Sequence, residues 1–293
     1  MPEPLLDRQF LEKLERLTIY WQKSFAGLVG GHNPSRFAGG GQEFLDHRNF
    51  HQGDDLRAVT WRAYLRLEKL FLKMFQIEPR VPVQVLLDSS ASMGLGDGVK
   101  FDYARKLAGA LAYVGLVRLD TLTIVPFSAR LGEAKRCGGG RHRFSPVATY
   151  LERLQAGGKT DFYEIAKEYM SSRPQRGLLI IISDFLDDQG CERALQYLAD
   201  FGHELSLIQI WKDDDRVPPW AGELELVDAE SGQEMRVEFD DAARAEYTRQ
   251  FDEYSAALKQ LALRNAGRYV SVSTSRLLED VLFDDMIRAR GVA

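Results

Sequence analysis

The chain has 293 residues, of which 45% are hydrophobic and 28% charged, enough for one large soluble domain with a packed core and a smaller accessory region. Its formal net charge of −5 argues against a nucleic-acid-binding protein, because such proteins usually carry a basic excess. The two cysteines, Cys137 and Cys191, form no CxxC pair, the first residues do not resemble a signal peptide, and no apolar run approaches the roughly 20 residues needed to span a bilayer. These features predict a cytoplasmic protein with reduced thiols.

The N-terminal region predicts a helix followed by an accessory segment. Apolar residues at three- and four-residue spacing predict one amphipathic helix over residues 5–28, whose apolar face would dock on its own domain, on a second copy or on a partner. A Gly-rich loop follows, then a helix over residues 54–66 and a strand over residues 70–77. We expect Trp61 and Phe44 to be buried with this strand.

From Pro82 onward, apolar strands and helices alternate, which predicts an α/β domain over residues 81–293 with the accessory region, residues 1–80, packed on it. The expected strands cover residues 83–87, 122–127, 131–136, 178–183, 205–210 and 268–272. The expected helices cover residues 99–117, 146–154, 161–171, 190–201, 240–265 and 276–289, and an inserted hairpin covers residues 223–239.

This alternation predicts a doubly wound, mostly parallel sheet with helices on both faces. In such a sheet the first strand lies beside the fourth. The strand order reverses between them, and ligands bind there, at the carboxyl ends of the strands.

Two acidic residues follow apolar strands of this predicted sheet. Asp88 begins a D-x-S-x-S sequence with Ser90 and Ser92, and Asp184 ends the strand that reads IIISD. A loop that reads GGKTD adds the hydroxyl of Thr160. An unpaired carboxylate at a partly desolvated sheet edge is costly, and a cation would relieve that cost. A site made only of oxygen atoms favours Mg²⁺ or Mn²⁺ over Zn²⁺, with Ca²⁺ a weaker candidate.

These five residues resemble, in order, the metal-ion-dependent adhesion site of von Willebrand factor A domains: Asp88, Ser90, Ser92, Thr160 and Asp184. The resemblance implies a Rossmann-like fold of the kind just described. It also implies a metal that binds a carboxylate supplied by a protein partner.

Residues 39–78 resemble the signature of the bacterial family catalogued as domain of unknown function fifty-eight, which precedes such an A domain, and the resemblance covers about residues 38–280. Phe50 stands where this signature usually has Tyr, and Thr60 stands where it usually has Asp. Many relatives carry membrane helices before this region, whereas an amphipathic helix takes that place here. The resemblance further implies a MoxR-type AAA+ ATPase as the partner.

Three functions remain open at this point. The favoured one is a metal-dependent protein-interaction module without catalytic activity. The second is a Mg²⁺-dependent phosphohydrolase that resembles the haloacid dehalogenases and uses Asp88, although Ser90 stands where those enzymes place an acid. The third is a structural scaffold with a vestigial metal site. No Ser-His-Asp arrangement and no phosphate-binding G-x-x-x-x-G-K-[ST] loop supports acyl transfer or nucleotide hydrolysis.

Overall fold

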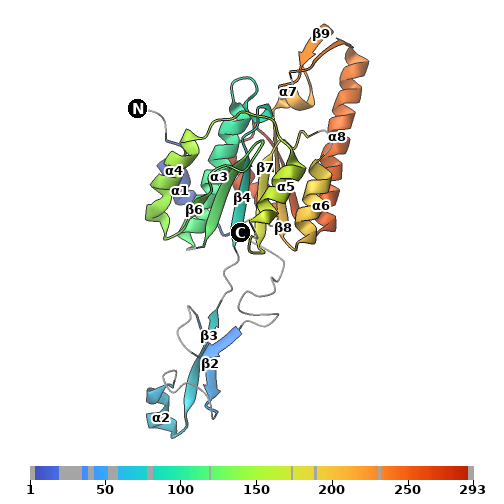
Figure 1. Ribbon diagram of the computed structural model, residues 1–293. Helices are drawn as coiled ribbons and strands as arrows, with labels where there is room; N and C mark the ends of the chain where they lie inside the picture. Colours follow the sequence, from blue (N-terminus) through green and yellow to red (C-terminus); the bar gives the residue numbers. More distant parts are fainter. Residues whose placement is uncertain are drawn as a thin grey trace. The chain divides into compact units, whose positions relative to one another are not determined.

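The computed structural model describes residues 4–19, 35–38, 43–51, 59–77, 82–118, 120–172, 174–187, 190–229 and 232–289, without the side chains of residues 35–47 and 73–77 (Figure 1). The chain divides into two compact units. Met1–Lys23 and Pro82–Ala293 form the main unit, and Ser24–Val81 form the second unit.

The main unit is built on a six-stranded sheet in the part of the chain that the structure describes, with the strand order β11-β8-β7-β4-β5-β6. The strands are β4 (Val83–Asp88), β5 (Leu122–Phe127), β6 (Lys135–Cys137), β7 (Leu178–Ser183), β8 (Glu204–Trp211) and β11 (Arg268–Ser273). Five strands are parallel, and the short β6 pairs antiparallel with β5 at one edge. The sequence predicted this edge strand at residues 131–136. The strand begins later, at Lys135, and Leu131 forms only an isolated β-bridge with Phe127.

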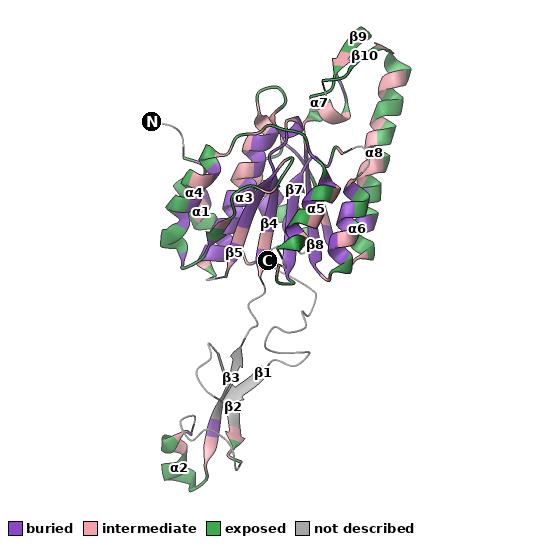
Figure 2. Cartoon of the chain, in the orientation of Figure 1, coloured by how far each residue is buried: buried purple, intermediate pink, exposed green. Residues whose placement is uncertain are grey.

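Helices cover both faces of this sheet, so the central strands are buried on both sides (Figure 2). In β7, Leu178, Ile180 and Ile182 face one core cluster, and Leu179 and Ile181 face the other. The first cluster includes side chains of α1 (Arg8–Leu14), α3 (Val99–Val117) and α4 (Phe144–Arg153). The second includes side chains of α5 (Phe162–Ser171), α6 (Cys191–Asp200) and α8 (Asp241–Arg264). The expected doubly wound α/β fold is therefore confirmed.

The helical elements of the main unit agree with most of the predicted ranges. They are α1 (Arg8–Leu14), η2 (Ser92–Gly94), α3 (Val99–Val117), η3 (Arg141–Arg143), α4 (Phe144–Arg153), α5 (Phe162–Ser171), α6 (Cys191–Asp200), α7 (Asp213–Arg216), α8 (Asp241–Arg264), α9 (Leu278–Asp280), η4 (Val281–Asp285) and α10 (Met286–Arg288). The closing helix expected at residues 276–289 begins later and contains the π-helical turn η4.

The first helix is much shorter than the sequence predicts. Asp7 caps its start by accepting a hydrogen bond from the Phe10 amide at 2.8 Å, and the helix ends at Leu14. In the tight turn that follows, the Leu17 amide donates a hydrogen bond to the Leu14 carbonyl. The expectation of a single helix over residues 5–28 is therefore wrong, although its part from residue 20 on lies outside the described residues.

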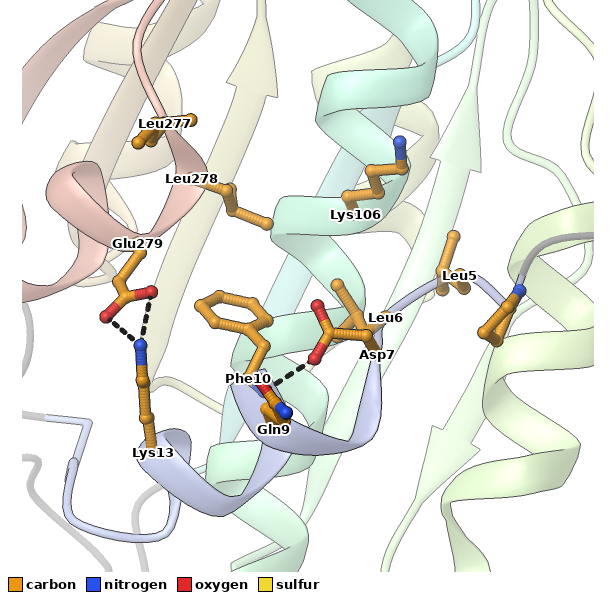
Figure 3. Close-up of a pocket in the computed structure, with 11 residues that line it drawn as sticks. Leu5, Leu6, Asp7, Gln9, Phe10, Lys13, Lys106, Leu277, Leu278 and Glu279 are labelled. Atoms are coloured by element: carbon orange, nitrogen blue, oxygen red, sulfur yellow. Dashed lines mark hydrogen bonds and ion pairs between the residues drawn. The ribbon is translucent and has the colours of Figure 1, made fainter.

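The apolar face of α1 packs against the main unit itself, which is one of the three arrangements that the sequence left open. Leu6, Phe10 and Leu14 are buried in the same core cluster as α3. An open pocket of about 590 Å³ lies between α1, α3 and the start of α9 (Figure 3). At its edge, the Lys13 ammonium forms an ion pair with Glu279 at 2.7 Å.

The expected hairpin is present as β9 (Gly222–Val227) and β10 (Glu234–Phe239), which pair antiparallel with each other. It lies between α7 and the long helix α8 in the chain. In Figure 1, it stands at the same end of the sheet as α7, the end at which the parallel strands terminate.

The second unit contains a three-stranded antiparallel sheet with the order β1-β3-β2. Its elements are β1 (Ser35–Ala38), β2 (Glu43–Asn49), α2 (Trp61–Leu67) and β3 (Phe71–Ile77). Trp61 is 57% exposed, and its ring lies edge-on to the ring of Tyr64 on the same helix. The expectation that Trp61 is buried is therefore wrong, and the side chain of Phe44 and the first residues of the expected helix, 54–58, lie outside the described part.

Among the helices of the described ranges, none is both long and apolar enough to cross a bilayer.

Candidate functional site

The candidate site forms where the strand order of the sheet reverses, because β4 lies directly between β5 and β7. The loops that follow β4 and β7 therefore leave the same edge of the sheet on neighbouring strands. This is the place at which open α/β sheets bind ligands.

The D-x-S-x-S loop folds back on the end of β4. The Asp88 carboxylate is completely buried, and its Oδ1 accepts a hydrogen bond from the Ser90 amide at 2.9 Å. The hydroxyls of Ser90 and Ser92 lie 2.9 Å apart, and Ser92 begins the 3-10 turn η2. One carboxylate and two hydroxyls are thus turned toward a common region.

The end of β7 adds a second carboxylate to this cluster. The Ser92 hydroxyl donates to Asp184 Oδ1 at 3.4 Å, and the Ser183 hydroxyl donates to Asp88 Oδ2 at 2.5 Å. Asp184 is 3% exposed. Hydrogen bonds therefore connect all four of the site residues that the sequence predicted on β4 and β7.

Thr160 reaches the same region through backbone contacts between its loop and the loop after β4. The Ala91 amide donates to the Gly158 carbonyl at 2.9 Å, and the Gly157 amide donates to the Ser89 carbonyl at 2.7 Å. Thr160 is buried two residues after Gly158, and Asp161 then caps α5. All five residues predicted for the metal site are thus buried on three loops that meet at one edge of the sheet.

Burial dominates the electrostatics of Asp88. Desolvation, and next the nearby charge of Asp184, raise the pKa of Asp88 to about 7, against hydrogen bonds from Ser183 and Ser90 that lower it. The ionised form of a carboxylate that is destabilised in this way is stabilised by any cation that approaches it.

The residues after β7 hold Asp184 in a defined orientation. Phe185 has a φ of 59°, which is rare for a bulky residue and costs about 1–3 kcal/mol. Its buried ring stacks on Phe162, with ring centroids 5.7 Å apart, and its amide donates to the Ser183 hydroxyl at 2.8 Å. Packing against the first turn of α5 thereby stabilises the backbone turn that carries Asp184.

Lys100, which was not among the residues predicted for the site, is 1% exposed at the first turn of α3. Its ammonium lies 2.8 Å from Asp184 Oδ2 and 3.2 Å from Asp215 Oδ2. Burial alone would lower the pKa of Lys100, but the two carboxylates outweigh this effect and raise it. The available signal was its spacing, because Lys100 continues the apolar row that Ala104, Leu107 and Leu111 form along α3.

The donor set fits a hard divalent cation in chemistry. It offers carboxylate and hydroxyl oxygens, no sulfur and no imidazole, which are the ligands that Mg²⁺ and Mn²⁺ prefer. Among the described residues, no three His, Cys, Asp or Glu side chains are grouped so as to hold a metal, so a metal here would depend on the hydroxyls. Lys100 is an additional positive charge at the edge of this set.

Several solved structures are similar in part. The conserved hypothetical protein BatB from Bacteroides thetaiotaomicron is 16% identical, with 69% of this chain and 97% of that chain covered and a TM-score of 0.39. The vWF domain of the type V pili tip protein Mfa5 from Porphyromonas gingivalis is 14% identical, with 72% and 97% covered and a TM-score of 0.33. The fold assignment therefore depends on the strand order and not on these scores.

Sequence comparison finds relatives over nearly the whole chain. The uncharacterized proteins Rv1480 of Mycobacterium tuberculosis (strain H37Rv) and Mb1516 of Mycobacterium bovis are each 25% identical, with 97% of this chain and 92% of each relative covered. The model of the family described as "Protein of unknown function DUF58" matches residues 46–257. This match spans more than half of the sequence and includes the candidate site, and the chain therefore belongs to the DUF58 family.

Proposed function

We propose that this protein is a divalent-metal-dependent protein-interaction module. The proposed ligands of the cation, Mg²⁺ or Mn²⁺ ahead of Ca²⁺, are Asp88, Ser90, Ser92, Thr160 and Asp184. The observation that carries the proposal is the convergence of two buried carboxylates and three hydroxyl residues on three loops at the reversal of strand order.

The two carboxylates and the hydroxyls would contribute differently to the binding of a cation at this site. Asp88 and Asp184 supply negative charge, whereas Ser90 and Ser92 supply neutral oxygens. A bound divalent cation would supply an electrophilic position that accepts a carboxylate oxygen from a partner protein. Such a contact is stronger at a partly desolvated edge than in bulk water, because the effective dielectric constant is lower there.

The loops around the site offer surface that a partner protein can cover. Leu95, the residue directly after η2, is 49% exposed, and Leu186, two residues after Asp184, is 45% exposed. Lys159 is exposed beside Thr160. A single metal contact provides specificity more than affinity, so apolar contacts of this kind would supply much of the binding free energy.

The proposed partner is a MoxR-type AAA+ ATPase that carries an exposed acidic residue. This part of the proposal comes from the resemblance of residues 39–78 to the family signature. An interaction role without catalysis remains a prediction.

The phosphohydrolase alternative requires Asp88 to act as a nucleophile. Enzymes of this kind also need a second carboxyl group for proton transfer, and Ser90 stands at that position. The residue at position 90 therefore favours binding over phosphoryl transfer.

Partner capture tests the proposed mechanism. The full chain is used to capture a MoxR-type ATPase from the cells that produce this protein, once in Mg²⁺ and once in EDTA. The proteins compared are wild type, Thr160→Ala and, as a control in the same exposed loop, Lys159→Ala. We expect chelation and Thr160→Ala to weaken capture at least tenfold, the loss of about 1.4 kcal/mol of binding free energy. Capture that survives both changes would show that the metal plays no part in the contact.

A further inference from the structure

Lys100 is a charged side chain in a position where α3 otherwise presents apolar residues to the core. Its side chain is 1% exposed, so its charge has lost nearly all contact with solvent. Burying an ammonium group costs several kcal/mol unless it is paired with good geometry. Lys100 lies next to the candidate metal site, and the carboxylates of Asp184 and Asp215 are its partners.

The two oxygens of Asp184 face different neighbours. Oδ1 accepts hydrogen bonds from the Ser92 hydroxyl at 3.4 Å and from the Leu186 amide at 3.2 Å. Oδ2 accepts a hydrogen bond from Lys100 at 2.8 Å. The positive charge of Lys100 is therefore separated from the cluster of hydroxyls by one carboxylate group.

Asp215, on α7, shares the charge of Lys100. Its Oδ2 lies 3.2 Å from the Lys100 ammonium and also accepts a hydrogen bond from the Lys212 amide at 2.9 Å. This second bond fixes the carboxylate at the start of α7. Asp215 draws part of the positive charge away from Asp184, and α7 thereby becomes an electrostatic neighbour of the site.

We propose that Lys100 is a built-in cation that lowers the affinity of this site for a divalent metal, and that Asp215 partly restores that affinity by sharing the charge of Lys100. The inference rests on the proposed metal-binding function. The affinity of an oxygen site for a divalent cation depends on its charge count, and Lys100 offsets one of the two carboxylates. The site would then hold its metal weakly and leave more of the metal's charge to attract a partner's carboxylate.

Lys100 also orients Asp184, and this effect would act in the opposite direction. If orientation dominated, loss of Lys100 would weaken metal binding, as the loss of an outer hydrogen-bond partner does at many metal sites. If charge dominates, as we propose, loss of Lys100 strengthens metal binding. The sign of the change therefore distinguishes the two roles.

The test is direct titration of the full chain with Mn²⁺, followed by electron paramagnetic resonance of the free ion. We expect Lys100→Met to bind Mn²⁺ about tenfold more tightly than wild type and Asp215→Asn to bind it several-fold more weakly. The matched control is Lys106→Met, because Lys106 lies on the same helix but pairs with Asp102, away from the site. This control should leave the affinity unchanged.

Unchanged or weaker binding in Lys100→Met would overturn the inference, provided that the variant folds by circular dichroism. If that variant does not fold, Asp215→Asn decides: weaker binding supports the inference, and unchanged binding overturns it. Asp88→Ala separates this inference from the function it depends on. If wild type binds Mn²⁺ through Asp88 but the Lys100 and Asp215 variants behave like Lys106→Met, only the role of Lys100 fails. If neither the wild type nor any variant binds Mn²⁺, both proposals fail.

Discussion

Asp88 is the residue on which the electrostatics of the candidate site depend most, because it is completely buried and lies near a second carboxylate. Its position after an apolar strand could be predicted from the sequence, and so could the other four oxygen donors. Their hydrogen-bond network could not be predicted, because it depends on which side-chain oxygens face each other across β4 and β7.

The pH dependence of metal binding follows from the raised pKa of Asp88. Because that pKa is about 7, protons compete with a metal for this carboxylate below neutral pH. We expect the Mn²⁺ affinity to fall about fivefold from pH 7 to pH 6, and to change little above pH 8, where Asp88 is ionised without metal. Calorimetric titration in buffers of different ionisation enthalpy measures this, since binding near pH 6 should release close to one proton. Equal affinity at pH 6 and pH 8 would show that Asp88 takes up no proton in this range, and so would contradict the raised pKa.

Lys100 shows why charged site residues can escape a sequence reading. A lysine at the start of a helix is usually solvated, and the place of Lys100 in the apolar row of α3 indicates burial without indicating a partner. Only the approach of Asp184 from β7 and of Asp215 from α7 gives Lys100 its partners. These contacts join residues that are far apart in the chain, so residue spacing carries no information about them.

At the scale of elements, strands buried on both faces were the most predictable. β5 and β7 have the predicted bounds, because each is a mostly apolar segment that contains β-branched residues and is too short for a typical buried helix. Helix α3 also has the predicted bounds. The range predicted for α1 was too long, because apolar residues continue at helical spacing after Leu14 although the backbone turns there.

The docking of α1 should contribute measurably to the stability of the main unit. Leu14 is completely buried in the core cluster of α3, so Leu14→Ala should lower the free energy of unfolding by about 2–5 kcal/mol. Urea denaturation followed by circular dichroism measures this value. Glu12→Ala is the control, since Glu12 lies on the exposed side of the same helix and should change stability by less than about 0.5 kcal/mol. A Leu14→Ala variant as stable as Glu12→Ala would mean that α1 does not pack as described.

At the scale of the whole molecule, the reversal of strand order brings the candidate ligands together, and this topology could be predicted from the alternation of strands and helices. The division into units could not. Residues up to Lys23 join the main unit, and the second unit begins at Ser24, whereas the sequence suggested one accessory region over residues 1–80. The family match begins at residue 46 and so includes part of both units. Packing of the second unit against the main unit remains a prediction.

Thermal unfolding of the full chain with and without Mg²⁺ tests the central claim, metal binding at the reversal of strand order, most directly. Metal at about one hundred times its Kd should stabilise wild type by about 2.7 kcal/mol, and Asp88→Ala should lose this stabilisation. Asp102→Ala should keep it, because Asp102 pairs with Arg105 and Lys106 outside the site. A wild-type melting temperature that does not respond to Mg²⁺ or Mn²⁺, or an Asp88→Ala variant that responds fully, would contradict the account.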